Sequence, residues 1–454
     1  MTKDLTNGHP LKIIFNFAFP VFLGYLFQQF YNLVDTIIVG QFLGVKALAA
    51  IGSTGSLNFF IIGFCMGLCS GFSIPVAQRF GGENYTAMRQ LIFNSWILIL
   101  VSCFALSIPS VMFCRPLLLL VKTPKDVVGM AYSYFVIILA GIPVTLFYNF
   151  LAGIIRSVGD SKTPLYFLII SALLNIALDL IFISLFNWGI PGAAYATVIS
   201  QGVSGVLCFF YMKAKFEILR FRKEDKTISR KKIMNLLGIG VPMGLQYSIT
   251  AIGSVILQSA VNALGSLYVA SVAAGQKITI FFSTPFDALG TTMATYGGQN
   301  VGAKKFERLN SGLFWGCLIG FIYSAVAFVV MFFFSRKLAM LFINQNESLE
   351  TASQIADNVR IFLLANSGFY ILLTLVNAVR FLIQGMGFSK TAIFAGAFEL
   401  VGRAVIGIMF VPLFGFPAAC FASPLAWVLA DSFLISAYFA CKKKLIKRFN
   451  EDKW

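Results

Sequence analysis

The strongest constraint on this chain is a series of apolar stretches, each of about 20 residues or more, which is long enough to cross the ~30 Å hydrocarbon core of a bilayer as a helix. They recur along most of its 454 residues. Hydrophobic residues make up 58% of the chain and charged residues only 12%, a balance outside the range of soluble domains. The stretches lack the alternation expected of membrane β-strands. The sequence therefore predicts an all-α integral membrane protein.

We expect these stretches to form twelve transmembrane helices. Their predicted ranges are residues 13–42, 48–77, 90–114, 128–155, 164–186, 192–214, 234–262, 267–298, 309–335, 353–383, 389–413 and 417–441. Because twelve is an even number, both termini lie on the same side of the membrane.

The formal net charge of +17 has an explanation in the membrane topology. The basic residues gather in the termini and in alternate loops, and the opposite side of the membrane receives only Lys46, Arg115, Lys122, Lys125, Arg336 and Lys337. Since Lys and Arg are retained on the cytoplasmic side, both termini are predicted to be cytoplasmic. The charge therefore does not call for a nucleic-acid partner.

The two halves of the chain repeat one another. VAQRFGGENYTAMRQ, after the second predicted helix, corresponds to YGGQNVGAKKFERLN after the eighth, with Gln78 aligned to Gln299 at a spacing of 221 residues. Within one residue of that spacing, Pro20 meets Pro242. Further along, RSVGDSKTP is echoed by QGMGFSKTA and GIPGAAYA by GFPAACFA. These correspondences indicate an internal duplication.

Each half has six helices, so the halves are related by an axis along the membrane normal, as in transporters built from parallel repeats. We expect two six-helix lobes, residues 1–214 and 234–454, the second with a basic C-terminal tail. Residues 215–233 form a cytoplasmic linker that either lies on anionic lipid or is a solvated connector. A pair of lobes can expose the space between them to alternate sides, which favours transport over catalysis.

Seven charged residues within predicted helices are taken as functional candidates, because an ionised group inside a bilayer is costly. They are Asp35, Asp179, Lys277, Asp287, Arg360, Glu399 and Arg403. Glu399 and Arg403 are four residues apart on one helix and are interpreted as a structural pair. Arg360 can extend its charge to the membrane surface, and the roles of Lys277 and Asp287 stay open.

Asp35 and Asp179 differ from the others because neither has an opposite charge in its own helix. Both lie about seven residues before the outer end of their helices, so we expect them at similar depth. Gln28, Tyr31 and Asp35 fall on one helical face, and Asn175 and Asp179 on another. Two polar stripes can then converge in the first lobe, although each carboxylate could instead only fix helix packing.

A carboxylate with no Lys or Arg beside it can be neutralised by a proton, by Na⁺ or by a cationic ligand, and these compete. Burial disfavours the ionised form of such a group, so Asp35 is a candidate for loading and releasing a proton. Pro20 removes a backbone donor and can bend the first helix. This competition is what an antiporter requires.

These features together resemble the multidrug and toxic compound extrusion (MATE) family over residues 10–440. The resemblance rests on five stretches of sequence. They are residues 20–44, which begin at Pro20 and end in YNLVDTIIVGQFLG, then RSVGDSKTP at 156–164, LNIALD at 174–179, GAAYAT at 192–197 and GGQNVGA at 297–303. It implies cation-coupled export by two six-helix lobes. The positions it assigns to cation or proton coupling are Gln28, Tyr31, Asp35, Asn175 and Asp179. Those it assigns to substrate binding are Asp35, Tyr31, Asn149, Asn175 and Thr197, and Pro20 is the bending point.

One position departs from the resemblance. Members of the NorM-like branch carry a Glu where this chain has Thr250, so the chain is closer to the DinF-like branch, for which the resemblance implies H⁺ coupling in preference to Na⁺. The resemblance also implies a bacterial cytoplasmic membrane protein. We expect a monomer with small organic cations and drugs as substrates, and neither cofactor nor resident metal.

The alternative transport function is flipping of a lipid-linked precursor by the same architecture, which would need several cationic residues along the substrate path. Catalysis would need a nucleophile with a base, or a metal site. The single histidine, His9, precedes the first helix, and a phosphate-binding GxxxxGKS motif is absent from the sequence. We therefore predict a secondary transporter that is not an enzyme and not an ATP-driven pump.

Overall fold

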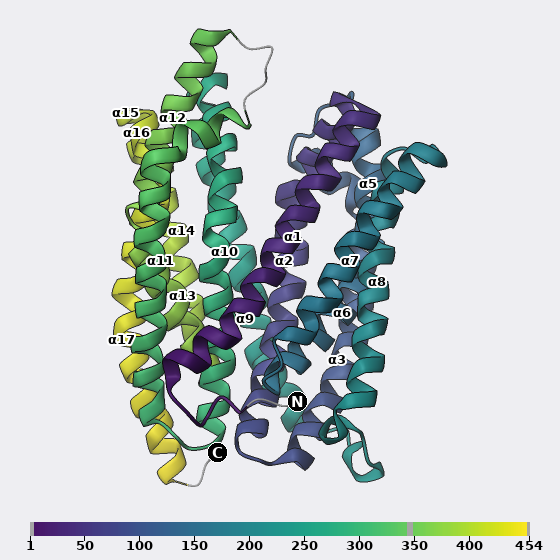
Figure 1. The fold of residues 1–454 in the computed structure, drawn as a ribbon, viewed down its shortest axis with the longest axis vertical. Coiled ribbons are helices and arrows are strands. Elements are labelled where there is room, and N and C mark those ends of the chain that lie inside the picture. The colour runs from purple at the N-terminus through teal and green to yellow at the C-terminus, as the bar shows by residue number, and fades with distance from the viewer. Residues whose placement is uncertain (1–3, 343–347, 452–454) are drawn as a thin grey trace. The chain divides into compact units, whose positions relative to one another are not determined.

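The computed structural model describes residues 4–342 and 348–451. Over these residues the chain forms helices and no strands, which confirms the all-α prediction (Figure 1). Within the described residues, nine single helices are long and apolar enough to cross a membrane, and two pairs of helices bent by 45° and 47° bring the total to eleven if each pair is one span. The remaining predicted span, 267–298, lies in the 37-residue helix α10.

By their internal contacts the helices divide into two units. The first unit contains Phe19–Ser248 with the short segments 4–6 and Val301–Lys304. Its helices are α1 (Pro10–Leu43) from Phe19 onward, α2 (Val45–Gly81), α3 (Tyr85–Met112), α4 (Cys114–Leu120), α5 (Val128–Ala140), α6 (Ile142–Ser157), α7 (Lys162–Asp179), the π-helix η1 (Leu180–Leu185), α8 (Ile190–Lys215), the short 3₁₀ helices η2 (Glu217–Leu219) and η3 (Lys223–Asp225), and the first part of α9 (Arg230–Asn262).

The second unit contains Asn7–Ala18, Ile249–Asn300 and the described residues from Lys305 onward. Its helices are the first part of α1, the rest of α9, α10 (Ser266–Gly302), α11 (Glu307–Met340), α12 (Leu349–Ser367), α13 (Tyr370–Gly385), α14 (Ser389–Val405), the π-helix η4 (Ile406–Phe410), α15 (Val411–Phe414), α16 (Phe416–Cys420) and α17 (Ala422–Asn450). The leading helix of each half, α1 or α9, therefore contributes residues to both units.

Three features of the first unit recur in the second, in keeping with the duplication. The bent pairs are α5–α6 in the first unit and α12–α13 in the second. Helix α7 continues into the π-helix η1, and α14 continues into the π-helix η4. Helices α2 and α10 both have 37 residues.

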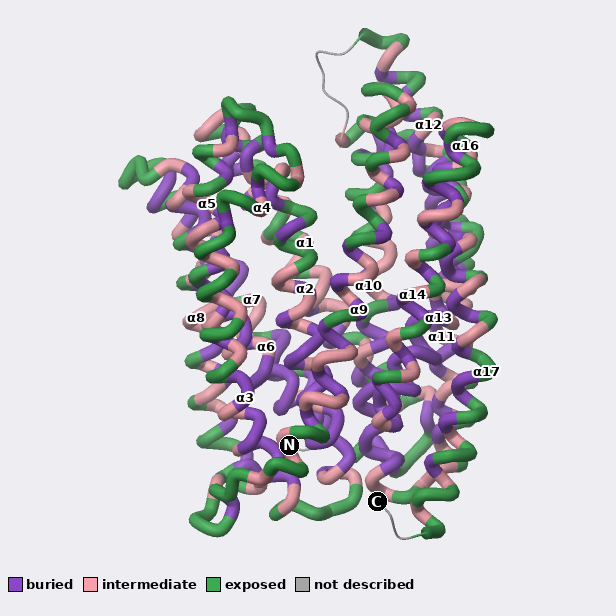
Figure 2. The backbone as a smooth tube through the Cα atoms, turned by 180° about the vertical axis from the view of Figure 1, so that it is seen from behind, coloured by how far each residue is buried: buried purple, intermediate pink, exposed green. Residues whose placement is uncertain are grey.

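Packing within the first unit depends on close approach of backbones. A Cβ atom on Gly71 of α2 would lie 2.4 Å from the Cα atom of Gly240 in α9, and one on Gly67 would lie 2.5 Å from the carbonyl oxygen of Met243. Helices that approach this closely require glycine at the contact. Buried, intermediate and exposed residues alternate along the helices (Figure 2).

The apolar residues of the linker pack on the first unit. Phe216 and Leu219 are buried in its hydrophobic core, and the ring of the half-buried Phe221 packs edge-on against Phe93 of α3 at 6.0 Å. The apolar part of the alternating pattern therefore docks the linker on its own lobe, while basic residues such as Arg220 and Arg222 stay exposed.

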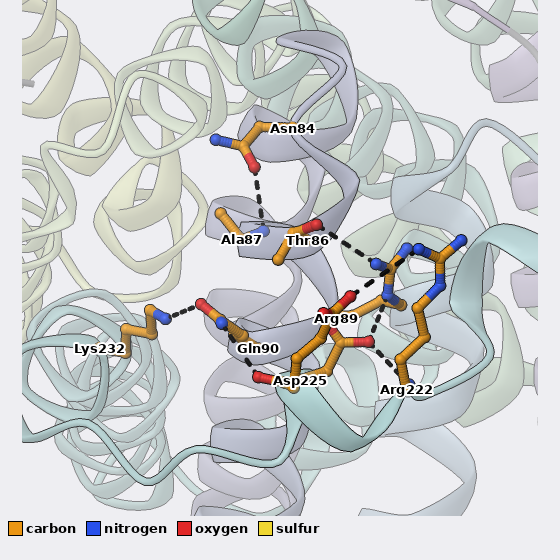
Figure 3. Close-up of polar contacts among 9 residues, drawn as sticks. Asn84, Thr86, Ala87, Arg89, Gln90, Arg222, Asp225 and Lys232 are labelled. Carbon is orange, nitrogen blue, oxygen red and sulfur yellow. Dashed lines mark hydrogen bonds and ion pairs between the residues drawn. The ribbon is translucent and has the colours of Figure 1, made fainter.

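A buried ion pair fixes the end of the linker to α3 (Figure 3). Arg89 Nε donates to Asp225 Oδ2 at 2.6 Å, and the two side chains are 5% and 0% exposed. Asn94 accepts a hydrogen bond from the backbone of Ser229 and donates one to the carbonyl of Thr227. Burial alone would raise the pKa of Asp225, but hydrogen bonds from Arg89 and from the Arg222 backbone outweigh it and hold the pKa below its usual value.

Candidate functional site

Helices α1 and α7 bring Asp35 and Asp179 together in the first unit. Each carboxyl group lies within hydrogen-bonding range of the other when one of them carries a proton. Sequence reasoning placed them at similar depth on separate helices, and the packing of the first unit supplies the contact.

Both acids are buried without a cationic partner. Asp35 is 8% exposed and Asp179 is 0% exposed. Neither oxygen of Asp179, nor Oδ1 of Asp35, receives a hydrogen bond from the described residues, and neither acid takes part in an ion pair among them. Burying one charge without a partner costs several kcal/mol or more. Two adjacent negative charges would cost more still, so this arrangement favours binding of a positive charge from elsewhere.

Neutral polar side chains lie near the acids. Tyr31 of α1 lies within hydrogen-bonding reach of Gln28 and Gln201 and within electrostatic range of both acids. Thr145 Oγ1 of α6 donates to Gln201 Oε1 of α8 at 2.8 Å. Four helices thus contribute to one polar cluster, and none of the described Lys or Arg residues forms an ion pair with its acids.

Asn175 extends the cluster along α7. Its Nδ2 donates to Thr197 Oγ1 of α8 at a long 3.5 Å, and Thr197 in turn donates to the carbonyl of Ala193. The amide oxygen of Asn175 receives no hydrogen bond from the described residues. Asn149 of α6 is half-buried and donates to the carbonyl of Thr145 in its own helix, so it reaches the cluster only through Thr145.

The backbone next to Asp179 is not regular α-helix. Asp179 is the last residue of α7, and the π-helix η1 begins at Leu180. A π-helical turn widens the helix and commonly occurs at functional sites. Pro20 lies inside α1. The residues of α1 up to Ala18 belong to the second unit, and those from Phe19 onward belong to the first. Asp35 and Pro20, the expected bending point, are therefore on the same continuous helix.

Three members of the cluster were missed from sequence. Tyr134 of α5 lies in electrostatic contact with Asp35, Tyr31 and Asp179, and Thr145 and Gln201 complete the hydrogen-bond chain. Thr145 precedes Asn149 by one helical turn, a polar spacing that could have been noticed. Nothing in the local sequence of Tyr134 or Gln201 distinguishes them from packing residues.

The other charged residues within helices have different surroundings. Lys277 is exposed, with its ammonium 6.0 Å from the centre of the Phe342 ring, and Arg360 lies 5.9 Å from the Phe332 ring. Asp287 is exposed on α10. Neither Lys277 nor Asp287 forms an ion pair among the described residues, so the structure assigns no charge partner to either, and their roles stay open.

Glu399 has a nearer partner than the one expected. It pairs with Arg380 of α13, a residue that sequence reasoning overlooked, whereas Arg403 Nη2 lies 3.6 Å from its other oxygen. Arg403 also donates to the backbone carbonyl of Thr250 at 3.4 Å. In the second unit, two resident guanidinium groups therefore neutralise Glu399.

The described residues do not gather potential metal ligands in one place. They contain no group of three or more His, Cys, Asp or Glu side chains that could hold a metal ion. The eight cysteines are all free and buried. The polar cluster of the first unit is suited to reversible binding of a small cation.

Comparison with known proteins identifies the family. Residues 20–181 and 242–413 match the MatE family. Probable multidrug resistance protein YpnP of Bacillus subtilis (strain 168) is 30% identical over 356 residues, which cover 77% of this chain and 78% of that protein. Probable multidrug resistance protein YoeA of the same organism is 29% identical over 349 residues, 75% of each chain.

A solved structure, the crystal structure of MATE in complex with MaL6, matches with a TM-score of 0.88 over 98% of both chains at 24% identity. That similarity establishes the fold alone, a multi-pass helical membrane protein. The family match covers the corresponding part of both halves. The chain therefore belongs to the MatE family, the MATE transporters, which are secondary transporters and not enzymes.

Proposed function

We propose that this protein is a secondary active multidrug exporter that exchanges cationic or amphiphilic organic compounds for H⁺ through the Asp35–Asp179 site. The observation that carries the proposal is the pair of buried carboxyl groups without a counter-charge in the first unit. Its relatives YpnP and YoeA are described as probable multidrug resistance proteins, which supports drugs as the substrate class.

The exchange follows from competition for one negative site. A proton on one carboxyl lets it donate a hydrogen bond to the other, so the pair is stable with a single negative charge or none. A lipophilic cation can take the place of the proton, but only when the site is ionised. Each binding event therefore requires the other positive species to have left, and each proton that moves down a potential of 100 mV supplies about 2.3 kcal/mol.

Aromatic residues near the acids suit the proposed substrates. Tyr31 and Tyr134 contact the acids electrostatically and are half-buried. Aromatic rings attract organic cations through their π faces, and an apolar wall tolerates substrates of different shape. We propose Asn149, Asn175 and Thr197 as further polar contacts for substrate.

Na⁺ is the second candidate for the coupling ion. The acids and the unpartnered amide oxygen of Asn175 are oxygen ligands, which hard cations prefer. H⁺ is favoured because it needs only the carboxyl pair itself.

Transport of anionic lipid-linked precursors has less support. That function would need cationic side chains available to the substrate, but Arg380 and Arg403 both contact Glu399.

We further propose that the protein acts in a bacterial cytoplasmic membrane as a monomer, with both termini in the cytoplasm.

The test is uptake of a fluorescent cationic drug into inside-out proteoliposomes under an imposed pH gradient or an imposed Na⁺ gradient. We expect the pH gradient to drive transport by the natural protein, and Asp35→Asn and Asp179→Asn to abolish that transport. The matched control is Asp357→Asn, because Asp357 is an acid whose side chain is 52% exposed in a surface ion pair with Arg336. Full drug accumulation by Asp35→Asn would refute the exchange site. If only the Na⁺ gradient drives transport, then the coupling ion is Na⁺ and the proposal of H⁺ coupling is wrong.

A further inference from the structure

We propose that Asp431, in the second unit, is a proton-binding carboxyl separate from the Asp35–Asp179 site. It lies on α17, in a cluster with Arg380 of α13 and Glu399 and Arg403 of α14. Helices α13 and α14 both pack on α17. The proposal does not rest on the proposed function, because protonation of one side chain can be measured without transport.

The surroundings of Asp431 do not suit a carboxylate ion. Its side chain is only 4% exposed, and neither of its two oxygens receives a hydrogen bond from the described residues. Buried carboxylates normally accept several hydrogen bonds, since a buried polar group without a hydrogen-bond partner is unfavourable, and more so if it is charged. A proton removes the charge, and with it most of that cost.

The nearby arginines are already committed to another acid. Arg380 pairs with Glu399, and Arg403 lies within 3.6 Å of the same carboxylate. Arg380 and Glu399 both act on Asp431 electrostatically, with opposite sign, so their effects on it partly cancel. Arg380 therefore does not serve Asp431 as a dedicated counter-ion, although its Nε has no hydrogen-bond partner among the described residues.

The remaining ionisable neighbours are few. Cys317 of α11 is in electrostatic contact with Asp431, and Asp287 of α10 interacts with Arg380. Helices α12 and α16 also pack on α17, but none of their described residues is among the charged groups that act on Asp431. The Cys317 thiol cannot neutralise Asp431. Asp287 competes with Asp431 for the positive charge of Arg380.

A proton fits this site better than a metal ion. The described residues offer no group of three acidic, His or Cys ligands, and two guanidinium groups in the cluster repel a metal cation. With Asp431 ionised, the four residues Arg380, Glu399, Arg403 and Asp431 sum to zero charge, and with Asp431 protonated they sum to one positive charge. Protonation therefore switches the charge of the interior of the second unit.

The experiment compares two buried acids of the same chain, Asp431 and Asp225. Full-length protein in nanodiscs is examined near neutral pH by infrared difference spectroscopy, in which a protonated carboxyl has a C=O band that a carboxylate lacks. We expect Asp431→Asn to remove one protonated-carboxyl band and Asp225→Asn to remove none, because Asp225 accepts hydrogen bonds from Arg89 and Arg222 and is ionised.

Thermal unfolding of the same variants gives a second measurement. Asn is nearly isosteric with a protonated Asp, so Asp431→Asn should melt at the temperature of the natural protein, whereas Asp225→Asn should melt several degrees lower. If Asp431→Asn retains every protonated-carboxyl band, or is destabilised as strongly as Asp225→Asn, then Asp431 is ionised and the proposal is wrong.

Discussion

The acid pair of the first unit and the Glu399 cluster of the second occupy related places in a duplicated chain but have opposite charge arrangements. RSVGDSKTP and QGMGFSKTA begin at residues 156 and 384, 228 positions apart, and the same spacing carries Asn175 onto Arg403. Pro20 and Pro242 are 222 positions apart, and that spacing carries Gln28 onto Thr250. In the structure Arg403 contacts Thr250.

The difference between the two units is the source of positive charge. The first unit has neutral amides at these positions and leaves Asp35 and Asp179 without a counter-charge, so an exchangeable cation can bind. The second unit has a resident guanidinium there, which cannot leave. The comparison suggests that a duplicated helix bundle can serve exchange in one half and fixed charge pairing in the other through a few substitutions.

The largest expected effect comes from giving the first unit a resident cation. Asn175→Arg places a guanidinium one turn from Asp179, and an opposite charge at such a distance favours an ionised carboxyl by about 10- to 1,000-fold. We expect drug uptake driven by a pH gradient to be lost while the protein still folds. Transport assays in proteoliposomes check the first expectation, and size-exclusion chromatography the second.

Asn175→Gln is the comparison for that experiment, because it adds length without charge and should therefore lose less proton-driven transport than Asn175→Arg. Normal proton-driven transport by Asn175→Arg would show that a resident cation is compatible with exchange, and the contrast between the units would then have no functional meaning.

The second-largest effect, on stability, is expected when Glu399 loses its main partner, Arg380. Arg380→Met leaves a buried carboxylate with only the 3.6 Å contact to Arg403, and breaking a buried pair on one side typically costs about 3–5 kcal/mol. We expect a clearly lower melting temperature in detergent. The double variant Arg380→Met with Glu399→Gln should recover much of that loss, and equal melting of both variants would contradict the pairing.

A smaller and pH-dependent effect is expected at Asp225. Its folded-state pKa is lowered, so its ion pair contributes stability that is fully present above the usual carboxyl pKa of about 3.9 and is lost as pH falls through the lowered folded value. Asp225→Asn should therefore destabilise the protein at pH 7 and lose less stability than the natural protein on acidification. Melting curves measured from neutral pH downward test this, and parallel curves for the two proteins would be inconsistent with it.

The smallest effect concerns Arg403. Arg403→Asn introduces the residue type that the first unit has at the aligned position, Asn175. It removes the long hydrogen bond from Arg403 to Thr250 and the more distant of the two positive charges near Glu399. Because Arg380 still neutralises Glu399, we expect a loss of about 1 kcal/mol, the usual contribution of one hydrogen bond. Chemical unfolding in detergent measures it. A loss as large as that of Arg380→Met would show that the two arginines are equivalent partners.

Local pattern predicted much of the candidate site but few of its contacts. Helical periodicity was enough to place Gln28, Tyr31 and Asp35 on one face and Asn175 and Asp179 on another. The contributions of Gln201 and Tyr134 come from α8 and α5, and their positions depend on how those helices pack. The same limit explains why Glu399 was assigned to Arg403, four residues away, when its nearest partner, Arg380, is on another helix.

The linker illustrates the same limit. Its alternating basic and apolar residues indicate an amphipathic segment, but amphipathicity does not specify whether the apolar face meets lipid or protein. Burial of Phe216 and Leu219 and the ion pair of Asp225 with Arg89 are decided by α3, more than 100 residues earlier in the chain.

The sequence by itself determined the membrane helices, the duplication and the two acids of the first unit that have no opposite charge in their own helix, because these depend on apolar length, repeated motifs and the charges within one helix. Only the tertiary structure decided that Asp35 and Asp179 meet, that Arg380 serves Glu399 and that Asp431 is left without a partner. Those facts depend on which faces of distant helices come into contact, and close packing, unlike periodicity, is a property of the whole bundle.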